Sequence, residues 1–258
     1  MRSVSSSPTA VPPGASILTG DHLIVGVQPE PLKRFTSGHL YTLSGSSGSG
    51  CTTVMNNLLD SNNGLRVVGI EKQFTRQFRT GESASQQVHQ EDMFRDIGRG
   101  NFLYFMNAHG NWYYTPLQNI AKALDKGSNA LLELPSRVAL ELKRLLPNLV
   151  TTFLIVPPKT AAGRYDEEVL AGRLRDRMED VGKIQERVVT GRDALVEADR
   201  FDYVIENPQA KAGEKLADAA TREIEAVIRA RETSSKVSFQ GRMNAFNPFI
   251  LLSPAQVA

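Results

Sequence analysis

The sequence predicts an α/β domain with a mainly parallel sheet of about five strands, flanked by helices. Short and almost wholly apolar runs alternate with longer segments of helical periodicity. This alternation is typical of buried parallel strands joined by crossover helices. A glycine-rich loop, GSSGSGCT at residues 45–52, joins the first apolar run of this pattern to the helical segment that follows. The order of strand, loop and helix supports the same fold class.

Each expected element has its own signal. The strands are the apolar runs at residues 39–44, 66–70, 130–134, 150–156 and 202–206. One helix starts at Pro116 and ends at Gly127, with an apolar face of Leu117, Ile120, Ala121 and Leu124. The next two helices are one that carries Val138, Leu142 and Leu145 and one that starts after Pro157-Pro158. The last two are one with Ile184, Val188 and Leu195, and one over about 212–230 that buries Leu216, Ala220, Ile224, Val227 and Ile228.

Composition excludes several classes of protein. The 258 residues are 41% hydrophobic and 22% charged, with a formal net charge of +2, which does not favour nucleic acid or an anionic membrane as a partner. The single cysteine excludes an internal disulfide. There is no apolar run of about 20 residues and no secretory signal core, so we expect a cytoplasmic protein.

The two ends differ from the middle of the chain. Residues 1–16 are rich in serine and proline and predict a disordered leader, followed by an N-terminal extension at 17–37. The main domain is expected at 38–231, with an insert at about 71–115 and a helical lid at about 159–187. The tail at 232–258 contains Phe239, Phe246 and Phe249, so it is expected to pack on the body or on a protein partner.

The loop at 45–52 has the chemistry of a phosphate-binding loop. Glycines allow successive backbone N–H groups to surround a phosphate, the following helix adds its positive end, and the Thr52 hydroxyl can bind Mg²⁺. Cys51 stands where such loops carry a lysine that contacts the β- and γ-phosphates. A plain turn or linker is the alternative, but the flanking strand and helix favour a nucleotide-binding loop. Its expected contacts are Gly45, Ser47, Gly48, Ser49, Gly50, Cys51, Thr52 and Thr53.

Five further segments resemble guanylate kinases in order and spacing. They are TRQFRTGE at 75–82, GNWYYT at 110–115, VPP at 156–158, RLRDR at 173–177 and FDYVIEN at 201–207. The resemblance covers roughly residues 38–230. It implies a nucleoside-monophosphate-kinase-like fold, with ATP and Mg²⁺ as substrate and cofactor.

The resemblance also implies roles for particular residues. Arg76 and Arg79 would hold the phosphate of the acceptor, with Tyr113 and Thr115 across the cleft, because guanidinium groups bind phosphate in bidentate geometry. The lid arginines Arg173, Arg177 and Arg187 would stabilise the charge of the transferring phosphoryl group. Asn207 would lie near adenine. For each arginine, a solvated surface charge is the alternative.

The departures from the family concern the acceptor. Tyr104 and Pro135 stand where guanylate kinases carry the two acids that read guanine, although Glu133 matches the first acid of the second segment. Gln86 stands where a tyrosine contacts the GMP phosphate. Guanine specificity is therefore doubtful.

Ribose 1,5-bisphosphate kinases resemble this chain in some of these departures. They have a similarly shortened segment after the arginine loop, which is TRQFRTGE at 75–82 in this chain, and they have a triplet like Pro135-Ser136-Arg137. This resemblance favours a phosphorylated sugar as acceptor. Arg137 would contact its phosphate, or would simply begin a helix.

Two classes of function follow. The first is a phosphotransferase acting from ATP onto a nucleoside monophosphate or sugar phosphate, in which Lys72 replaces the missing loop cation. Lys72 ends the second expected strand, where ligands of parallel sheets bind, although it could instead pair with Glu71 or Glu82. The second is a catalytically inactive module that binds a nucleotide or a protein. Intact Thr52, TRxxR and lid arginines favour the first class, whereas Cys51, the missing guanine readers, the serine- and proline-rich leader and the phenylalanine-rich tail favour the second.

Overall fold

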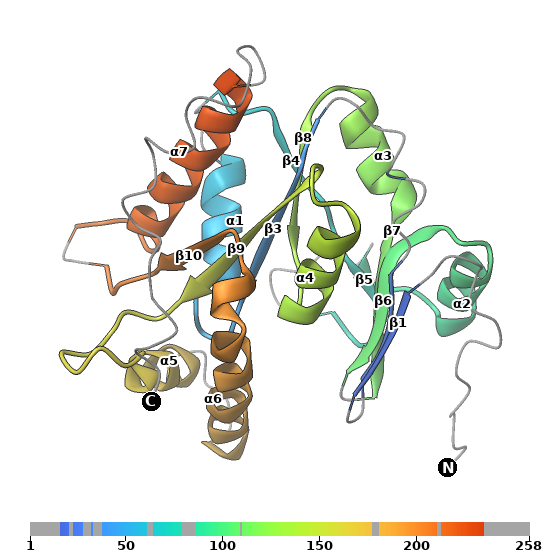
Figure 1. Cartoon of the computed structure of the whole chain (residues 1–258). Helices are drawn as coiled ribbons and strands as arrows, with labels where there is room; N and C mark the ends of the chain where they lie inside the picture. The colour runs from blue at the N-terminus through green and yellow to red at the C-terminus, as the bar shows by residue number, and fades with distance from the viewer. Residues whose placement is uncertain are drawn as a thin grey trace. The chain divides into compact units, whose positions relative to one another are not determined.

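The computed structural model describes residues 16–20, 23–27, 32, 38–60, 64–78, 86–108, 110–176, 181–210 and 213–234. The chain divides into two compact units. Unit 1 comprises residues 1–40, 68–132 and 141–150, and unit 2 comprises 41–67, 133–140 and 151–258. Figure 1 shows the elements, coloured along the chain.

The described strands form two five-stranded sheets. The expected parallel sheet is confirmed, with the order β10-β9-β3-β8-β4. Its strands are β3 (Leu40–Gly45), β4 (Val67–Gly69), β8 (Asn129–Glu133), β9 (Val150–Val156) and β10 (Tyr203–Glu206). Their bounds differ from the expected ones by at most one residue at either end. β3, β8 and β9 are almost wholly buried, and a nearly continuous apolar run is a strong signal for a strand buried on both faces.

The other sheet was not anticipated, and it lies in unit 1. Its order is β1-β2-β6-β7-β5, and all its pairings are antiparallel. The strands are β1 (Ser16–Gly20), β2 (Leu23–Val27), β5 (Gln73–Phe74), β6 (Phe102–Ala108) and β7 (Asn111–Pro116). Ser16, the last residue of the expected leader, already pairs with Val27 in this sheet.

Helix α2 (Gln90–Gly98) covers part of this sheet through an aromatic core in unit 1. Its members are Met93, Ile97, Phe102, Phe105, Trp112 and Tyr114. The Tyr114 hydroxyl donates to Asp96 Oδ2 over 3.2 Å. Burial, together with the Asp96 carboxylate, raises the pKa of the Tyr114 phenol above its usual value. This hydrogen bond ties α2 to β7.

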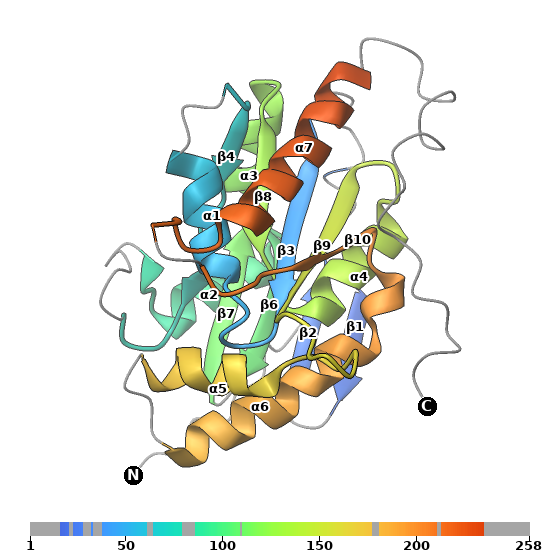
Figure 2. The ribbon, with the colours of Figure 1, turned by 90° about the vertical axis from the view of Figure 1, so that its left-hand side faces the viewer.

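In unit 2, helices α1 (Cys51–Asp60) and α7 (Asp218–Ser234) lie side by side (Figure 2). Asn57 Nδ2 donates to the Leu216 carbonyl over 2.8 Å and to Thr221 Oγ1 over 3.3 Å. Strands β9 and β10 are held in register by Asp202, whose Oδ2 accepts from the backbone N and the Oγ1 of Thr152. The glycine-rich loop therefore lies on a tightly bonded framework of helices and strands.

The remaining helices are α3 (Leu117–Asp125), α4 (Ser136–Leu145), α5 (Glu167–Arg175), α6 (Val181–Val196) and the short η3 (Ala198–Arg200). α5 does not start directly after Pro157-Pro158. A turn intervenes, and the helix begins where the Asp166 side chain accepts hydrogen bonds from the backbone N of Glu168 and Val169. A carboxylate at the N-cap accepts hydrogen bonds from N–H groups of the first turn that have no partner within the helix, and so favours a helix start at this residue.

The prediction that Leu216 is buried is wrong. Leu216 is 67% exposed and lies before α7, which starts at Asp218. Ala217 has a φ of 59°, so the helical periodicity is broken between Leu216 and the helix. Ala220, Ile224 and Ile228 are buried as expected. Among the described residues, no helix is long and apolar enough to cross a membrane.

Candidate functional site

The glycine-rich loop in unit 2 makes a tight turn between β3 and α1. Gly48 and Gly50 adopt φ values of 85° and 104°, which L side chains rarely tolerate. Ser49 N donates to the Ser46 carbonyl over 3.0 Å, and Val54 N donates to the Gly50 carbonyl over 2.9 Å. The loop therefore runs directly into the first turn of α1, where backbone N–H groups and the helix dipole favour an anion.

Cys51 is the first residue of α1 and is buried, with 7% of its surface exposed. Its Sγ lies 3.4 Å from Ser49 Oγ. A neutral thiol in this place supplies no positive charge, so the loop lacks the cation that lysine would contribute. Ser47 is exposed at the turn, and Thr53 is half-buried.

Thr52 and Glu133 meet in unit 2. The exposed Thr52 donates from Oγ1 to Glu133 Oε2 over 3.0 Å, and Glu133 is the last residue of β8. A hydroxyl at the start of the loop helix beside a carboxylate at a strand end is a donor set that Mg²⁺ accepts in phosphate-loop proteins. The structure thus places Glu133 beside Thr52, the expected metal ligand, whereas the sequence analysis assigned Glu133 to acceptor binding.

Asn207 and Arg173 both contact the loop. Asn207, which follows β10, donates from Nδ2 to the Ser49 carbonyl over 2.7 Å, and it is 3% exposed. Arg173 on α5 donates from Nη1 to the Gly48 and Ser49 carbonyls, over 3.2 and 3.3 Å. Its Nη2 donates to the Asn207 and Pro208 carbonyls, over 2.8 and 3.1 Å. Both residues therefore support the loop itself.

The other lid arginines are less informative. Arg187 lies half-buried on α6. Arg177 lies outside the described residues.

In unit 1, Arg76 lies beside two aromatic rings. The Arg76 guanidinium carbon lies 4.0 Å from the Phe74 ring centroid and 5.9 Å from that of Tyr113. Arg76 Nη1 also donates to the Gln77 carbonyl over 2.8 Å. Cation–π contacts fix the orientation of this charge beside the tyrosine. Arg79 lies outside the described residues.

The remaining acceptor residues are placed as follows. Thr115 is buried on β7, and Tyr104, opposite it on β6, is 1% exposed. Arg137 is exposed in the first turn of α4, and Lys72 is half-buried just before β5. Gln86 Nε2 donates to the Lys72 carbonyl over 3.4 Å.

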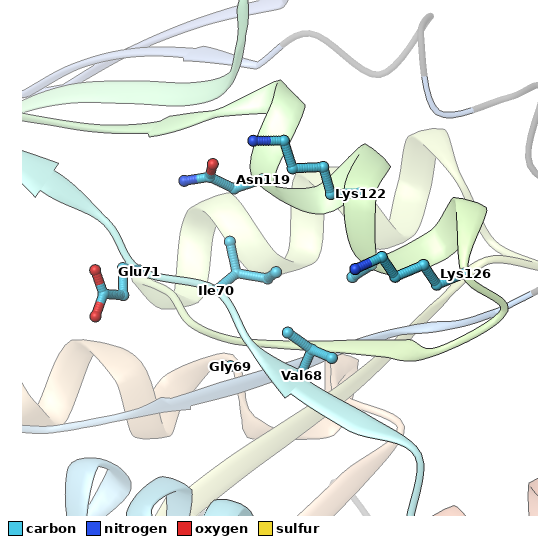
Figure 3. Close-up of a pocket in the computed structure, with 8 residues that line it drawn as sticks. Val68, Gly69, Ile70, Glu71, Asn119, Lys122 and Lys126 are labelled. Atoms are coloured by element: carbon cyan, nitrogen blue, oxygen red, sulfur yellow. The ribbon is translucent and has the colours of Figure 1, made fainter.

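Unit 1 also contains cavities. One, of about 270 Å³, lies between β4 and α3, with Val68 and Ile70 facing Asn119, Lys122 and Lys126 (Figure 3). Another, of about 460 Å³, lies beside the arginine loop and is lined by Thr75, Phe78, Gln87, Val88, His89, Gln90, Gly110 and Asn111. The second cavity borders both segments that resemble the acceptor-binding motifs.

The fold and the loop define the class of the protein. A parallel sheet with a strand, glycine loop and helix, a hydroxyl on that helix and a neighbouring carboxylate describe a phosphate-loop protein. The guanylate kinase family model matches residues 37–231. The chain therefore belongs to the guanylate kinase family, whose members are nucleotide-binding phosphotransferases.

Individual relatives agree with the family. The chain is 32% identical over 199 residues to the guanylate kinase of Alcanivorax borkumensis, covering 75% of this chain and 87% of that one. It is 31% identical over 214 residues to that of Onion yellows phytoplasma, covering 81% and 93%. The crystal structure of guanylate kinase from Anaplasma phagocytophilum has a TM-score of 0.55 at 23% identity, covering 76% and 87%. This last comparison supports the fold alone.

Several contacts in this site were not predicted from the sequence. Thr52 and Glu133 are separated by 81 positions, and each was interpreted alone. Parallel strands that end at one edge of a sheet were the available signal. For Arg173 the lid motif gave its position on a helix, but no pattern indicated backbone carbonyls as its partners.

Proposed function

We propose that the chain is a phosphotransferase that binds ATP and Mg²⁺ at the glycine-rich loop and transfers a phosphoryl group to a small phosphorylated acceptor. The observation that carries the proposal is the Thr52–Glu133 pair beside the glycine loop. An exposed hydroxyl next to a carboxylate contributes little to packing, but its oxygens would suit a divalent cation that binds together with the nucleotide.

The reaction transfers the γ-phosphoryl group to a phosphate oxygen of the acceptor. The bond between the γ-phosphorus and the bridging oxygen breaks, ADP leaves, and a new phosphoanhydride linkage forms on the acceptor. Backbone N–H groups of the loop hold the β-phosphate, and the lid residues Arg177 and Arg187 neutralise the developing charge. Lys72 supplies the cation that Cys51 does not.

The acceptor is a nucleoside monophosphate or a sugar phosphate. Arg76, oriented by Phe74 and Tyr113, holds its phosphate together with Arg79 and Arg137. The phenol of the buried Tyr104 is a weaker hydrogen-bond acceptor for guanine N–H groups than a carboxylate, which favours an acceptor without guanine.

A non-catalytic module is the alternative, in which the loop binds a nucleotide without turnover or the tail binds a protein. The buried, uncharged Cys51 favours it. The C-terminal tail from residue 235 lies outside the described residues.

Calorimetric titration with MgATP and MgADP, followed by a transfer assay with GMP and ribose 1,5-bisphosphate, tests the proposal. Binding with transfer to either acceptor supports the phosphotransferase. Binding without transfer supports the module, and the absence of nucleotide binding refutes both nucleotide functions.

Removing the metal pair should weaken magnesium-dependent binding selectively. We expect Thr52→Val and Glu133→Gln each to reduce the affinity for MgATP by about tenfold, since each removes one oxygen ligand or its orienting partner. The affinity for ATP measured with EDTA should change by less than about twofold, because no metal is then present to be held. Equal losses with and without Mg²⁺ would contradict a metal role.

Arg76→Met should weaken binding of the acceptor and leave binding of the nucleotide unchanged. The loss of a charge-assisted hydrogen bond of about 1.5–3 kcal/mol corresponds to a rise of roughly 10- to 100-fold in the KM of the acceptor. The matched control is Arg95→Met, because Arg95 is exposed on α2 of the same unit and pairs locally with Asp92. An unchanged acceptor KM in Arg76→Met would refute the assignment.

A further inference from the structure

Arg173 makes four hydrogen bonds to backbone carbonyls in unit 2. One nitrogen of its guanidinium reaches the loop carbonyls of Gly48 and Ser49, and the other reaches those of Asn207 and Pro208. A planar guanidinium has enough N–H donors, in two forked ends, to bond both segments at once, whereas an ammonium has only three N–H donors for these four carbonyls. The loop is therefore fastened to the chain that follows β10.

These bonds fix the direction of the loop's peptide groups. In a trans peptide the C=O and the next N–H point in opposite directions. The Ser49 carbonyl accepts from both Arg173 and Asn207 Nδ2, so the N–H of Gly50 is directed away from them. Hydrogen bonding to a cation also polarises the peptide group, which makes its N–H a better donor.

Helix α5 contacts the loop closely enough to hold this arrangement. A Cβ at Gly48 would lie 3.1 Å from the Leu170 carbonyl and 3.4 Å from Leu174 Cγ. Both leucines are at most 1% exposed. The guanidinium is thus carried by a helix whose apolar face is buried, so the charge is held in place before any ligand binds.

We infer that Arg173 is a positioning residue that compensates for the lysine missing at Cys51. It places a fixed positive charge on the loop and aims the loop's N–H groups at a phosphate without touching the phosphate itself. This inference rests on the proposed function, since it concerns phosphate binding at the same loop, and it assigns Arg173 a role other than charge stabilisation at the transferring group.

The test is a double-mutant cycle between Arg173→Met and Cys51→Lys, with MgADP affinity measured by calorimetry. In the wild-type background, Arg173→Met should weaken MgADP binding by roughly 10- to 100-fold, which is the loss of charge-assisted bonds that orient the site. In the background that carries Cys51→Lys, the same change should cost less than about threefold, because the introduced lysine supplies the charge directly. Coupling of this kind is what a cycle isolates.

Two further variants separate the role of Arg173 from packing. Arg173→Lys retains the charge and should lose less affinity than Arg173→Met; if Arg173→Met does not fold, Arg173→Lys in the two backgrounds provides the same comparison. Arg175→Met is the matched control on α5, since Arg175 is exposed and pairs with Glu168. It should bind MgADP like the wild-type chain.

Equal losses in both backgrounds, or unchanged affinity with a lower melting temperature, would overturn the inference and leave the proposed function standing. Failure of the wild-type chain to bind MgADP would overturn the proposed function and the inference together.

Discussion

Cys51→Lys is expected to raise the rate of phosphoryl transfer by about 10²- to 10³-fold, the amount by which loss of one preorganised donor at a developing oxyanion lowers the rate. The wild-type residue is a buried thiol at the first position of α1, beside the loop's N–H groups. A lysine there extends from the start of the helix toward the β- and γ-phosphates. The measurement is kcat with saturating MgATP and the acceptor that the transfer assay identifies.

Two controls separate charge from bulk and from other cations. Cys51→Met adds a long side chain without charge and should not raise kcat. Lys72→Ala should abolish the residual activity of the wild-type chain but should lower kcat less in the background that carries Cys51→Lys. Lys122 is an exposed lysine on α3, and Lys122→Ala should leave kcat unchanged in both backgrounds. A kcat that Cys51→Lys does not raise would show that the loop no longer serves phosphoryl transfer.

The parallel sheet was predictable because its strands carry their signal locally. Residues 150–156 form β9 as expected, since VTTFLIV is apolar enough for burial on both faces. The antiparallel sheet was missed because FLYFMNA and NWYYTP were interpreted only as parts of motifs. β6 and β7 form a local hairpin in which Ala108 pairs with Asn111, but β6 also pairs with β2, where Val25 lies opposite Met106. That second pairing joins distant segments, so no local pattern indicates it.

The sequence predicts those parts of the candidate site for which a motif specifies both the residue type and the backbone conformation around it. The loop glycines and Thr52 follow from the order of strand, loop and helix. The partners of Glu133, Asn207 and Arg173 depend on which segments the fold brings beside the loop. Asn207 was expected near adenine, yet its amide bonds the Ser49 carbonyl, a contact between residues 158 positions apart. Motif position alone does not give such a contact.

Gly45→Ala is expected to destabilise the fold and to abolish nucleotide binding. A Cβ at this position would clash with Ser49 Oγ and would lie 2.6 Å from the Ile155 carbonyl and 2.8 Å from Cys51 Sγ. The Ile155 carbonyl belongs to a buried strand and cannot give way cheaply, so the loop itself must shift. Overpacking of this kind costs about 3 kcal/mol, which lowers the Tm of a chain of this size by roughly 6–12 °C.

Because the shifted loop in Gly45→Ala no longer surrounds a phosphate, MgADP affinity should fall below detection in calorimetry. Gly98→Ala is the matched control, since a Cβ there meets nothing within 4 Å and its φ is not positive. Thermal unfolding should show Gly98→Ala at or slightly above the wild-type Tm. If Gly45→Ala instead melts and binds MgADP like the wild-type chain, the close packing of the loop against β9 does not determine its phosphate-binding geometry.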